Sequence, residues 1–295
     1  MLTVSLLRQA CRMLGWTAIG PWPDHLEGVG SDTRQSLANQ VFVALVGEHF
    51  DGHDFIEAAV VAEARVLLVH RLFASQVARR HPDRLVVGVE DTLYAMGELA
   101  RLALLDDERM VVAITGSAGK TTTRWALVQT LEALGVQVHT QVGNENNRIG
   151  VPRFLLNLPA SETSDDVIVV ECGTSEPGEI ARLAAICRPN ISVVTSVCAA
   201  HTELLIDESG VAHEKGDLLR AASIGEGLAV LDLEDHRLLD AATEGERRVL
   251  QPYDLDDAEG WSDAPVHLRA NGSKVLAVVQ ALGHRLTARA IRAAR

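Results

Sequence analysis

Cysteine is scarce in this sequence, and no two cysteines stand at a metal-binding or redox spacing. The four are Cys11, Cys172, Cys187 and Cys198. Since no C-x-x-C pair occurs, neither a zinc knuckle nor a dithiol redox motif is indicated. Their sequence neighbours are largely apolar, so we expect buried free thiols in a protein of the reducing cytosol.

Long hydrophobic runs are also missing. No apolar stretch reaches the roughly 18 residues that a transmembrane helix needs. Residues 1–15 are interrupted by Ser5, Arg8 and Gln9, and therefore predict an amphipathic helix rather than a signal peptide. These absences predict a soluble, cytoplasmic protein without a membrane partner.

Basic residues are fewer than acidic ones. The chain has 27 Lys+Arg against 40 Asp+Glu, a formal net charge of −13. A protein that binds the nucleic-acid backbone carries a basic face, so we expect no nucleic-acid partner. A single nucleotide remains compatible, because a few backbone amides and one lysine are enough to hold its phosphates.

The chain has 295 residues, of which 47% are hydrophobic, enough for two α/β domains with buried cores. Residues 1–106 predict a small domain, and the polar stretch 106–109 is the expected boundary. The predicted strands are 41–45, 65–69 and 85–89, and the predicted helices are 1–15, 54–63 and 91–105, the last capped by Asp91.

Residues 107–295 predict a second domain in which apolar strands alternate with helices. Such alternation is typical of a mostly parallel sheet covered on both faces. The predicted strands are 110–114, 136–139, 167–170, 191–194 and 228–231. The predicted helices are 121–134, 177–187 with proline in its first turn, 208–222, 273–282 and 287–294, whereas 241–264 is polar and poorly periodic.

The clearest local motif is T-G-S-A-G-K-T-T-T at 115–123, between an apolar strand and a helix. Gly116 and Gly119 let the backbone bend so that its N–H groups point at phosphate oxygens. Lys120 would neutralise the β- and γ-phosphates, and the Thr121 hydroxyl would ligate Mg²⁺. The competing interpretation is a capped glycine turn with a solvated lysine. The generic pattern needs glycine where this chain has Ile114, so the motif is the shorter T-G-x-x-G-K-T-T variety.

This loop and the segments that follow it resemble the Mur ligases. The similar segments are G-N-E-N-N-R-I-G-V-P at 143–152, E-C-G followed by P-G-E-I within 171–180, A-H-T-E at 200–203, K-G-D at 215–217, and His267 with Asn271 before Leu282-Gly283. Earlier in the chain, 31–34, 41–45 and 50–55 resemble the family's uridine-nucleotide domain. The resemblance covers nearly the whole chain in family order.

The resemblance implies an ATP-dependent ligase that joins a carboxylate to an amine through an acyl phosphate. The carboxylate would be a UDP-muramyl peptide or a related compound, and the amine an amino acid or dipeptide. The implied substrate residues are Ser31, Asp32, Arg34, His49 and Phe50. The implied ATP-binding residues are Gly116, Ser117, Ala118, Gly119, Lys120, Thr121, Thr122, Asn147, His267 and Asn271.

The resemblance also implies a Mg²⁺ site and a catalytic set. The metal ligands would be Thr121, Glu171, His201 and Lys215, the lysine acting as a carbamate formed with CO₂. Lys120, Glu171, His201 and Lys215 would form the catalytic set. Without the family, each has an ordinary interpretation: Glu171 as a capping or ion-paired carboxylate, His201 as a polar surface residue, Lys215 as an exposed helix lysine, His267 as a loop residue and Asn271 as a helix cap.

The sequence departs from the family pattern at three places. Ser196 follows Thr195 where the family usually has asparagine, and the stretch 240–267 is short enough to lack a hairpin. Family members carry a third domain after the last helices, and the sequence ends at Arg295, so we expect that domain to be absent. Two alternatives to a self-sufficient ligase follow: a specialised ligase that obtains the third domain from a partner chain or a second copy, and a non-catalytic nucleotide-binding module.

Overall fold

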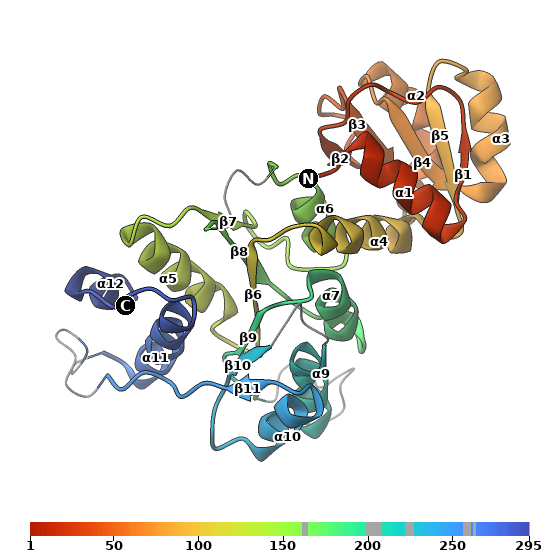
Figure 1. Ribbon diagram of the computed structural model, residues 1–295. Helices are drawn as coiled ribbons and strands as arrows, with labels where there is room; N and C mark the ends of the chain where they lie inside the picture. The colour runs from red at the N-terminus through yellow and green to blue at the C-terminus, as the bar shows by residue number, and fades with distance from the viewer. Residues whose placement is uncertain (161–164, 199–207, 222–226, 256–260, 262–263, 295) are drawn as a thin grey trace. The chain divides into compact units, whose positions relative to one another are not determined.

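The computed structural model describes residues 1–160, 165–198, 208–221, 227–255, 261 and 264–294. The chain divides into two compact units (Figure 1). Unit 1 comprises Met1–Asp107 and Arg148–Ser161, and unit 2 comprises Glu108–Asn147 and Glu162–Arg295. The first change of unit falls in the polar stretch 106–109. Residues 148–161 then return to unit 1, so its chain is discontinuous.

Unit 1 contains a five-stranded sheet with the order β1-β5-β4-β3-β2. Strands β2 to β5 run parallel, and β1 pairs antiparallel with β5 at the edge. The strands are β1 (Thr17–Ile19), β2 (Gly28–Gly30), β3 (Gln40–Val43), β4 (Val66–His70) and β5 (Leu85–Val89). The helices are α1 (Val4–Leu14), η1 (Gly52–Phe55), α2 (Ile56–Val61), α3 (Arg71–Arg80), α4 (Thr92–Leu105) and α6 (Gly150–Leu156).

Local sequence explains the elements of unit 1 that were predicted. The runs of Val and Leu in β4 and β5 are buried on both faces, as expected for central parallel strands. Helix α1 begins where the Thr3 side chain accepts from the Leu6 N–H and ends at Gly15 with φ 68°. Asp91 caps α4 by accepting from the Tyr94 N–H at 2.8 Å, which confirms that prediction.

Four elements of unit 1 were not predicted: β1, β2, α3 and α6. Strands β1 and β2 have three residues each, too few for alternation to show, and two of the three in β2 are glycines. Helix α6 is held by tertiary contacts that a local pattern does not reveal. After it, the Asn157 side chain accepts from the Val29 N–H at 2.7 Å and donates to the Val29 carbonyl at 3.0 Å.

Unit 2 contains a six-stranded, all-parallel sheet with the order β11-β10-β9-β6-β8-β7, which confirms the predicted sheet type. The strands are β6 (Met110–Thr115), β7 (Val138–Thr140), β8 (Val167–Glu171), β9 (Ile191–Val194), β10 (Leu228–Val230) and β11 (Arg248–Val249). The helices are α5 (Lys120–Ala133), α7 (Glu179–Cys187), α9 (Glu208–Arg220), α10 (His236–Glu244), α11 (Val266–Ala281) and α12 (Ala288–Ala293).

Helices cover both faces of the unit 2 sheet. Helices α5, α11 and α12 pack on one face, in a core that includes Val112, Leu127 and Val275. Helices α9 and α10 pack together against the other, in a core that includes Ala229, Leu219 and Leu238 (Figure 1). Because β6 lies between β8 and β9, the strand order reverses at β6. Ligands of open parallel sheets bind at such a switch point, beside the carboxyl ends of the strands.

Three predicted boundaries in unit 2 were wrong. Helix α7 begins at Glu179, after Gly178 with φ 84°, so Pro177 precedes the helix instead of lying in its first turn. Helix α11 begins at Val266, well before the predicted residue 273. Helix α10 extends into the stretch 241–264, which was expected to be irregular, and strand β11 lies within it. For α11 the reason is tertiary: the Trp261 ring packs on Gly272, where a Cβ would lie 2.0 Å from it.

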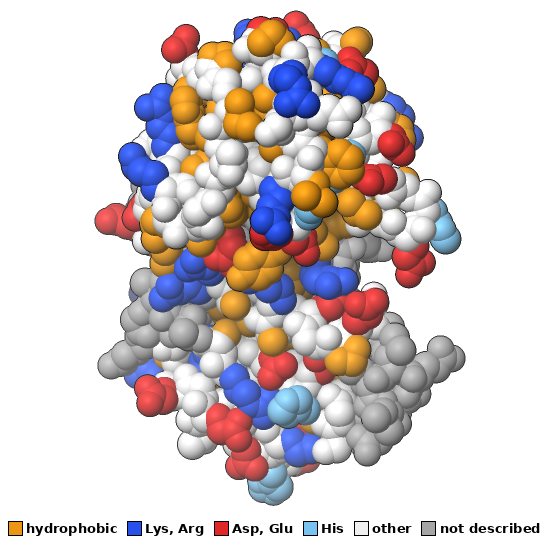
Figure 2. Space-filling model, turned by 90° about the vertical axis from the view of Figure 1, so that its right-hand side faces the viewer, with side chains coloured by type: hydrophobic (Ala, Val, Ile, Leu, Met, Phe, Trp, Pro, Cys, Tyr) orange, Lys and Arg blue, Asp and Glu red, His pale blue; other side chains and the backbone are white. Residues whose placement is uncertain are grey.

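All four cysteines are free thiols, as expected. Cys11, Cys172 and Cys187 are buried, but Cys198 is exposed in the segment after β9, so the expected burial was wrong there. In the described part of the chain, every helix is too short or too polar to cross a membrane. Positive and negative side chains are interspersed on the face drawn in Figure 2, without a basic stripe.

Candidate functional site

The candidate nucleotide site of unit 2 is the loop that joins β6 to α5, at the carboxyl edge of the sheet. Its two glycines have conformations that other residues rarely adopt, with φ 148° at Gly116 and φ 81° at Gly119. A Cβ on Gly116 would lie 2.0 Å from the Thr195 hydroxyl oxygen. The loop therefore needs glycine at this position for both its backbone angle and its close contact.

The segment after β9 supports this loop through hydrogen bonds. The Thr195 hydroxyl donates to the Ala118 carbonyl at 2.6 Å. The Ser117 N–H donates to the Ser196 carbonyl at 2.9 Å, and the Ala118 N–H donates to the Ser196 hydroxyl at 3.2 Å. Ser196, which departs from the family pattern, is thus a direct partner of the loop. These bonds hold the loop in shape, and they also use two of its N–H groups.

Lys120, the first residue of α5, folds back over the loop. Its ammonium donates to the Gly116 carbonyl at 2.7 Å and lies 3.5 Å from the Ser117 carbonyl. Burial lowers the pKa of Lys120, and the nearby Glu171 carboxylate opposes that shift. The cation is thus already placed inside the loop, where phosphate oxygens would compete with the two carbonyls for it.

Glu171 ends β8, and its two carboxylate oxygens have different partners. Oε1 accepts from the Thr121 hydroxyl at 3.1 Å and from the Asn146 amide at 2.9 Å. Oε2 faces the Arg124 guanidinium, with Nε at 3.3 Å. The residue is only 3% exposed, so the carboxylate is fixed rather than solvated. Carboxylate and hydroxyl oxygens side by side are the hard donors that Mg²⁺ prefers, so Thr121 and Glu171 fit a magnesium site.

The backbone of Glu171 is held by Gln141. The Glu171 N–H donates to the Gln141 side-chain oxygen at 2.8 Å, and the Gln141 amide donates to the Glu171 carbonyl at 2.9 Å. Arg124 in turn donates to the Gln141 carbonyl and lies 3.4 Å from the Gly143 carbonyl. Sequence reasoning missed the roles of Arg124 and Gln141. Their local signals were weak, since each is one polar residue in an ordinary helix or loop.

Lys215 lies on α9 and is 1% exposed, which excludes the exposed helix lysine that the residues alone suggested. Burial lowers the pKa of Lys215 to about 8; Lys120 also lowers it, whereas Glu214, Cys172 and Glu179 oppose the shift. A lysine with such a pKa is partly neutral near physiological pH, and a neutral amine is nucleophilic. This is the form that reacts with CO₂.

The acidic residues near Lys215 are already engaged by the start of α7. Glu214 accepts from the Gly178 N–H at 2.8 Å and the Ile180 N–H at 2.9 Å. Glu179 accepts from the Ser175 N–H and, at 3.1 Å, from the Glu176 N–H. Among the residues that the structure describes, none forms an ion pair or hydrogen bond with Lys215.

The remaining predicted residues of unit 2 differ in how they are placed. Asn271 lies within α11 beside the phosphate loop, because a Cβ on Gly119 would be 2.9 Å from its amide nitrogen. His267 is exposed one turn earlier on α11, so neither residue has the loop or cap position considered above. Asn147 and Thr122 are exposed. His201 lies outside the described residues, within which no group of three His, Cys, Asp or Glu could hold a metal.

The predicted substrate residues of unit 1 follow the carboxyl ends of β2 and β3. Asp32 and Arg34 bind each other, with Arg34 Nε and Nη2 each 2.8 Å from a carboxylate oxygen. The Arg34 hydrogen bonds lower the pKa of Asp32 to about 2. His49 and Phe50 are exposed, and the Phe50 ring lies over Gly47. These residues form an open, solvated surface.

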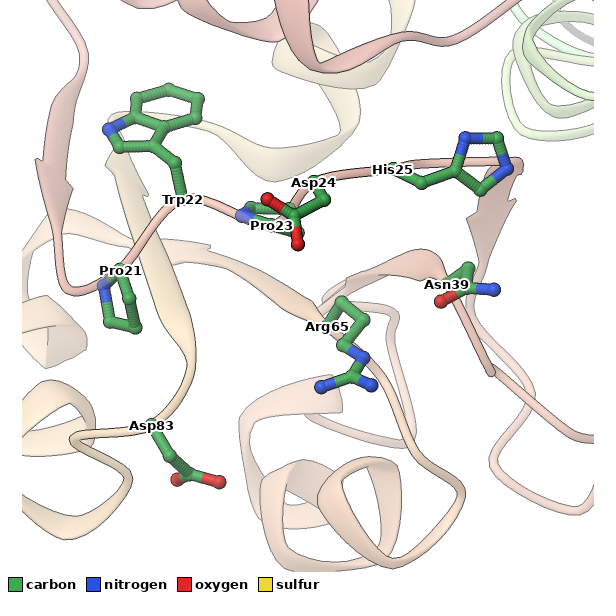
Figure 3. Close-up of a pocket in the computed structure, with 8 residues that line it drawn as sticks. All are labelled: Pro21, Trp22, Pro23, Asp24, His25, Asn39, Arg65 and Asp83. Atoms are coloured by element: carbon green, nitrogen blue, oxygen red, sulfur yellow. The ribbon is translucent and has the colours of Figure 1, made fainter.

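A hollow of about 310 Å³ lies at the opposite, amino edge of the unit 1 sheet (Figure 3). The segment 21–25 crosses above it, and Asn39 and Arg65 directly precede β3 and β4. No predicted substrate residue lines this hollow. Its lining residues are Pro21, Trp22, Pro23, Asp24, His25, Asn39, Arg65 and Asp83. The sequence carried no motif that marked them.

A strand, a glycine-containing loop and a helix at the carboxyl edge of a parallel sheet place unit 2 in the class of phosphate-loop α/β proteins. Residues 114–288 match the Mur ligase middle domain, and residues 25–103 match the Mur ligase family catalytic domain. The chain therefore belongs to the Mur ligase family.

Curated relatives at about 30% identity share one name, UDP-N-acetylmuramoyl-tripeptide–D-alanyl-D-alanine ligase. That of Bacillus subtilis strain 168 is 34% identical over 194 residues, or 66% of this chain and 41% of the relative. That of Escherichia coli strain K12 is 32% identical over 250 residues, or 84% of this chain and 53% of the relative. The chain thus spans about half the length of these relatives.

Solved structures support the same family. MurF from Acinetobacter baumannii shares the fold, with a TM-score of 0.81 at 24% identity, over 99% of this chain and 67% of that one. The MurF ligase from Thermotoga maritima in complex with ADP has a TM-score of 0.74 at 25% identity. It covers 90% of this chain and 65% of that one. A member of the family therefore binds an adenine nucleotide.

Proposed function

We propose that this chain acts in ATP-dependent formation of an amide bond between a carboxylate and an amine. One observation carries the proposal: the carboxyl edge of a single sheet holds a phosphate loop with Lys120, the buried Glu171 hydrogen-bonded to the Thr121 hydroxyl, and the buried Lys215. The names of the relatives supply the substrate class, a UDP-muramyl tripeptide as carboxylate and D-alanyl-D-alanine as amine.

The chemistry needs two steps. A carboxylate is a poor acyl donor, so its oxygen first attacks the γ-phosphorus of ATP, which forms an acyl phosphate and releases ADP. The neutral amine then attacks the acyl carbon, the amide bond forms, inorganic phosphate leaves, and the amine loses a proton. Negative charge crowds the first transition state, so electrostatic stabilisation dominates catalysis.

The residues of unit 2 have complementary roles in this proposal. Lys120 exchanges the Gly116 carbonyl for phosphate oxygens. Thr121 and Glu171 hold Mg²⁺, which neutralises phosphate charge when it is bound. Lys215 becomes a carbamate, an anion suited to the same metal set, by adding CO₂ and losing a proton. The role implied for His201 stays an expectation, as do adenine contacts from His267 and Asn271.

A non-catalytic nucleotide-binding module is the competing function. It would need the phosphate loop, but it would not need a buried lysine with no partner in the described chain. The buried amine of Lys215 therefore favours the ligase. A ligase that needs a partner chain for its third domain makes the same use of these residues, and the experiment below separates it by adding candidate partners.

The test is ATP turnover by the purified chain with a panel of UDP-muramyl peptides and amines, with and without candidate partner proteins. Phosphate release that requires both a carboxylate and an amine, and that Lys120→Ala abolishes, is the expected result. Nucleotide binding without substrate-dependent phosphate release under every condition would contradict the ligase and support the module.

A further inference from the structure

Tryptophan is rare in this chain, and two of its four tryptophans lie on either side of one short strand of unit 1. Trp16 directly precedes β1 and Trp22 lies shortly after it, whereas Trp125 and Trp261 belong to unit 2. Both indoles of unit 1 are half-buried and line a hollow of about 360 Å³. This hollow adjoins the one in Figure 3, because Trp22 lines both. Its lining residues are Arg8, Cys11, Arg12, Trp16, Ala18 and Trp22.

Helix α1 forms one side of this hollow, and the segment 16–22 forms the other. Arg8, Cys11 and Arg12 stand at i, i+3 and i+4, so they share one face of α1. Across from them, Ala18 is the middle residue of β1, and its side chain is small. Strand β1 lies at one edge of the sheet, whereas the predicted substrate residues follow β2 and β3 at the other edge. The hollow is therefore separate from the predicted substrate surface.

The positive charge of this hollow has no acidic counterpart nearby in the sequence. Residues 1–23 contain Arg8 and Arg12 but no Asp or Glu, in a chain whose formal net charge is −13. Among the described residues that line the hollow, none carries a carboxylate. Like charges at i and i+4 of a helix repel each other, so the arginine pair destabilises α1 slightly, and an external anion would offset that cost. The hollow therefore attracts negative charge from outside the chain.

Arg8 is held in place by Trp22. The central carbon of its guanidinium lies 4.7 Å from the centroid of the Trp22 ring, which is a cation–π contact. A guanidinium stacked on a ring keeps its N–H groups at its edge, where they can donate to a carboxylate or a phosphate. Arg12 is exposed one helical turn later on the same face and supplies a second guanidinium. The two side chains together suit a single anionic group.

The remainder of the hollow is aromatic and apolar. Trp16 and Trp22 offer flat π surfaces, and Ala18 and Cys11 add small side chains. Burial raises the pKa of the Cys11 thiol to about 11, although a backbone hydrogen bond opposes that shift, so the thiol stays uncharged near neutral pH. A volume of about 360 Å³ lies within the range of small-ligand sites, about 300–1,000 Å³. Flat apolar walls with cations on one side suit a flat apolar molecule that carries an anionic group.

We propose that this hollow binds a small, planar aromatic anion, whose anionic group is a carboxylate or a phosphate. The aromatic ring packs against the indoles of Trp16 and Trp22, and the anionic group accepts hydrogen bonds from Arg8 and Arg12. An anionic membrane is the other occupant that arginine and tryptophan attract, but the concave shape and the net charge of −13 favour a small ligand. The inference does not depend on the proposed function, since all the lining residues belong to unit 1.

The experiment follows the indole N–H signals of the whole chain by NMR while 2-naphthoate or 2-naphthyl phosphate is added. Each of the four signals is assigned by replacing one tryptophan with phenylalanine. The signals of Trp16 and Trp22 are expected to shift with both probes, and the probe that binds more tightly identifies the preferred anionic group. The signals of Trp125 and Trp261 are the internal control and should not move with 2-naphthoate. The neutral 2-naphthylmethanol, which lacks the anionic group, should bind about tenfold more weakly or less.

Two arginine variants show whether the anionic group is recognised here. Arg12→Gln removes one guanidinium from an exposed position, so we expect the fold to be unaffected. The affinity for both probes should fall about 10–100-fold, the range for loss of a charged hydrogen bond. Arg79→Gln removes an exposed arginine from α3 of the same unit and is the matched control, which should bind both probes as the wild type does.

Three results would overturn the inference, and none of them bears on the proposed function. The first is that neither probe shifts the Trp16 and Trp22 signals at millimolar concentration. The second is an equal probe affinity in the wild type and Arg12→Gln. The third is that the chain binds phosphatidylglycerol vesicles through Arg12 but binds neither probe, which would assign this surface to a membrane instead.

Discussion

The candidate sites of the two units are built in opposite ways. In unit 2, Glu171 and Lys215 are 3% and 1% exposed, and hydrogen bonds from distant segments hold the carboxylate of Glu171. In unit 1, the Arg34 side chain is 88% exposed and Phe50 is 54% exposed. Asp32 and Arg34 bind each other within one short loop.

The difference teaches where each site gains its specificity. A buried network in unit 2 fixes charges before any ligand arrives, so little reorganisation is needed when phosphates bind. The open surface of unit 1 has no such network and must be completed by its ligand. Substitutions that strain the loop or its buried supports in unit 2 should therefore change binding and stability together, whereas those in unit 1 should change binding of one ligand class alone.

The largest effect is expected from Gly116→Ala. The added Cβ meets the Thr195 hydroxyl at 2.0 Å, and the backbone has φ 148°. We expect unit 2 to lose about 1–3 kcal/mol of stability through strain. ATP binding should fall below detection in calorimetry.

Gly135→Ala is the matched control. Gly135 also has positive φ, but no atom lies within 4 Å of the added Cβ, so this variant tests the effect of backbone strain alone. If Gly116→Ala and Gly135→Ala bind ATP with equal affinity, the 115–121 loop is not the phosphate site. The proposed difference between a preformed site in unit 2 and an open site in unit 1 would then be wrong.

The second largest effect is expected from Lys120→Ala, which removes the loop's cation but empties no core space. ATP affinity should fall about 10–100-fold, the range for loss of a charged hydrogen bond, while the melting temperature stays close to that of the wild type. Calorimetric titration with Mg²⁺–ATP measures the first effect, and thermal melting measures the second. Equal ATP affinities for the wild type and Lys120→Ala would contradict the assignment of this loop as the phosphate site.

The third largest effect is expected in the pH dependence of stability. The pKa of Lys215 is lowered to about 8, below the ordinary 10.5, so the unfolded chain binds more protons between these values than the folded chain. Stability from this group therefore rises as pH increases from 8 toward 10.5, by on the order of 1–3 kcal/mol. Denaturant unfolding of wild type and Lys215→Met across this window measures it. Parallel pH profiles for the two proteins would contradict it.

Activity gives a separate test of the proposed carbamate. Lys215→Ala should lose ligase activity, and a short carboxylic acid in the buffer should restore part of it by replacing the missing anion. Glu171→Ala should lose activity without responding to the acid. Mass spectrometry of the intact wild-type chain at high bicarbonate provides the direct check, and an unmodified Lys215 together with no rescue would exclude the carbamate.

The smallest effect on the whole molecule is expected in unit 1. Asp32→Asn breaks an exposed pair with Arg34, and solvent-exposed pairs contribute little to stability. We expect an unchanged melting temperature and unchanged ATP affinity, but weaker binding of UDP. Titrations with UDP and ATP on the same variant measure both. A loss of ATP affinity would show that the two sites are not separable as described.

Much of the architecture could be predicted from local patterns. The apolar runs of β4, β5 and β8 and the capped start of α4 were evident, because burial on both faces and a capping aspartate leave clear sequence signals. Strands of two or three residues and helices held by remote contacts were missed. In β2, two glycines make the strand look like a turn until its pairing with β3 is known.

By itself, the sequence determined the phosphate loop, since its glycines, lysine and threonine are contiguous between a strand and a helix. Tertiary structure alone decided the surroundings of that loop. The Thr195 hydroxyl supports Ala118 from 77 residues away, and Gln141 holds Glu171 across 30 residues. It also buried Lys215 and Lys274 and brought Asn271 to Gly119. The physical reason is that burial and hydrogen bonding depend on which distant segments come into contact in the fold. A local sequence pattern does not contain that information.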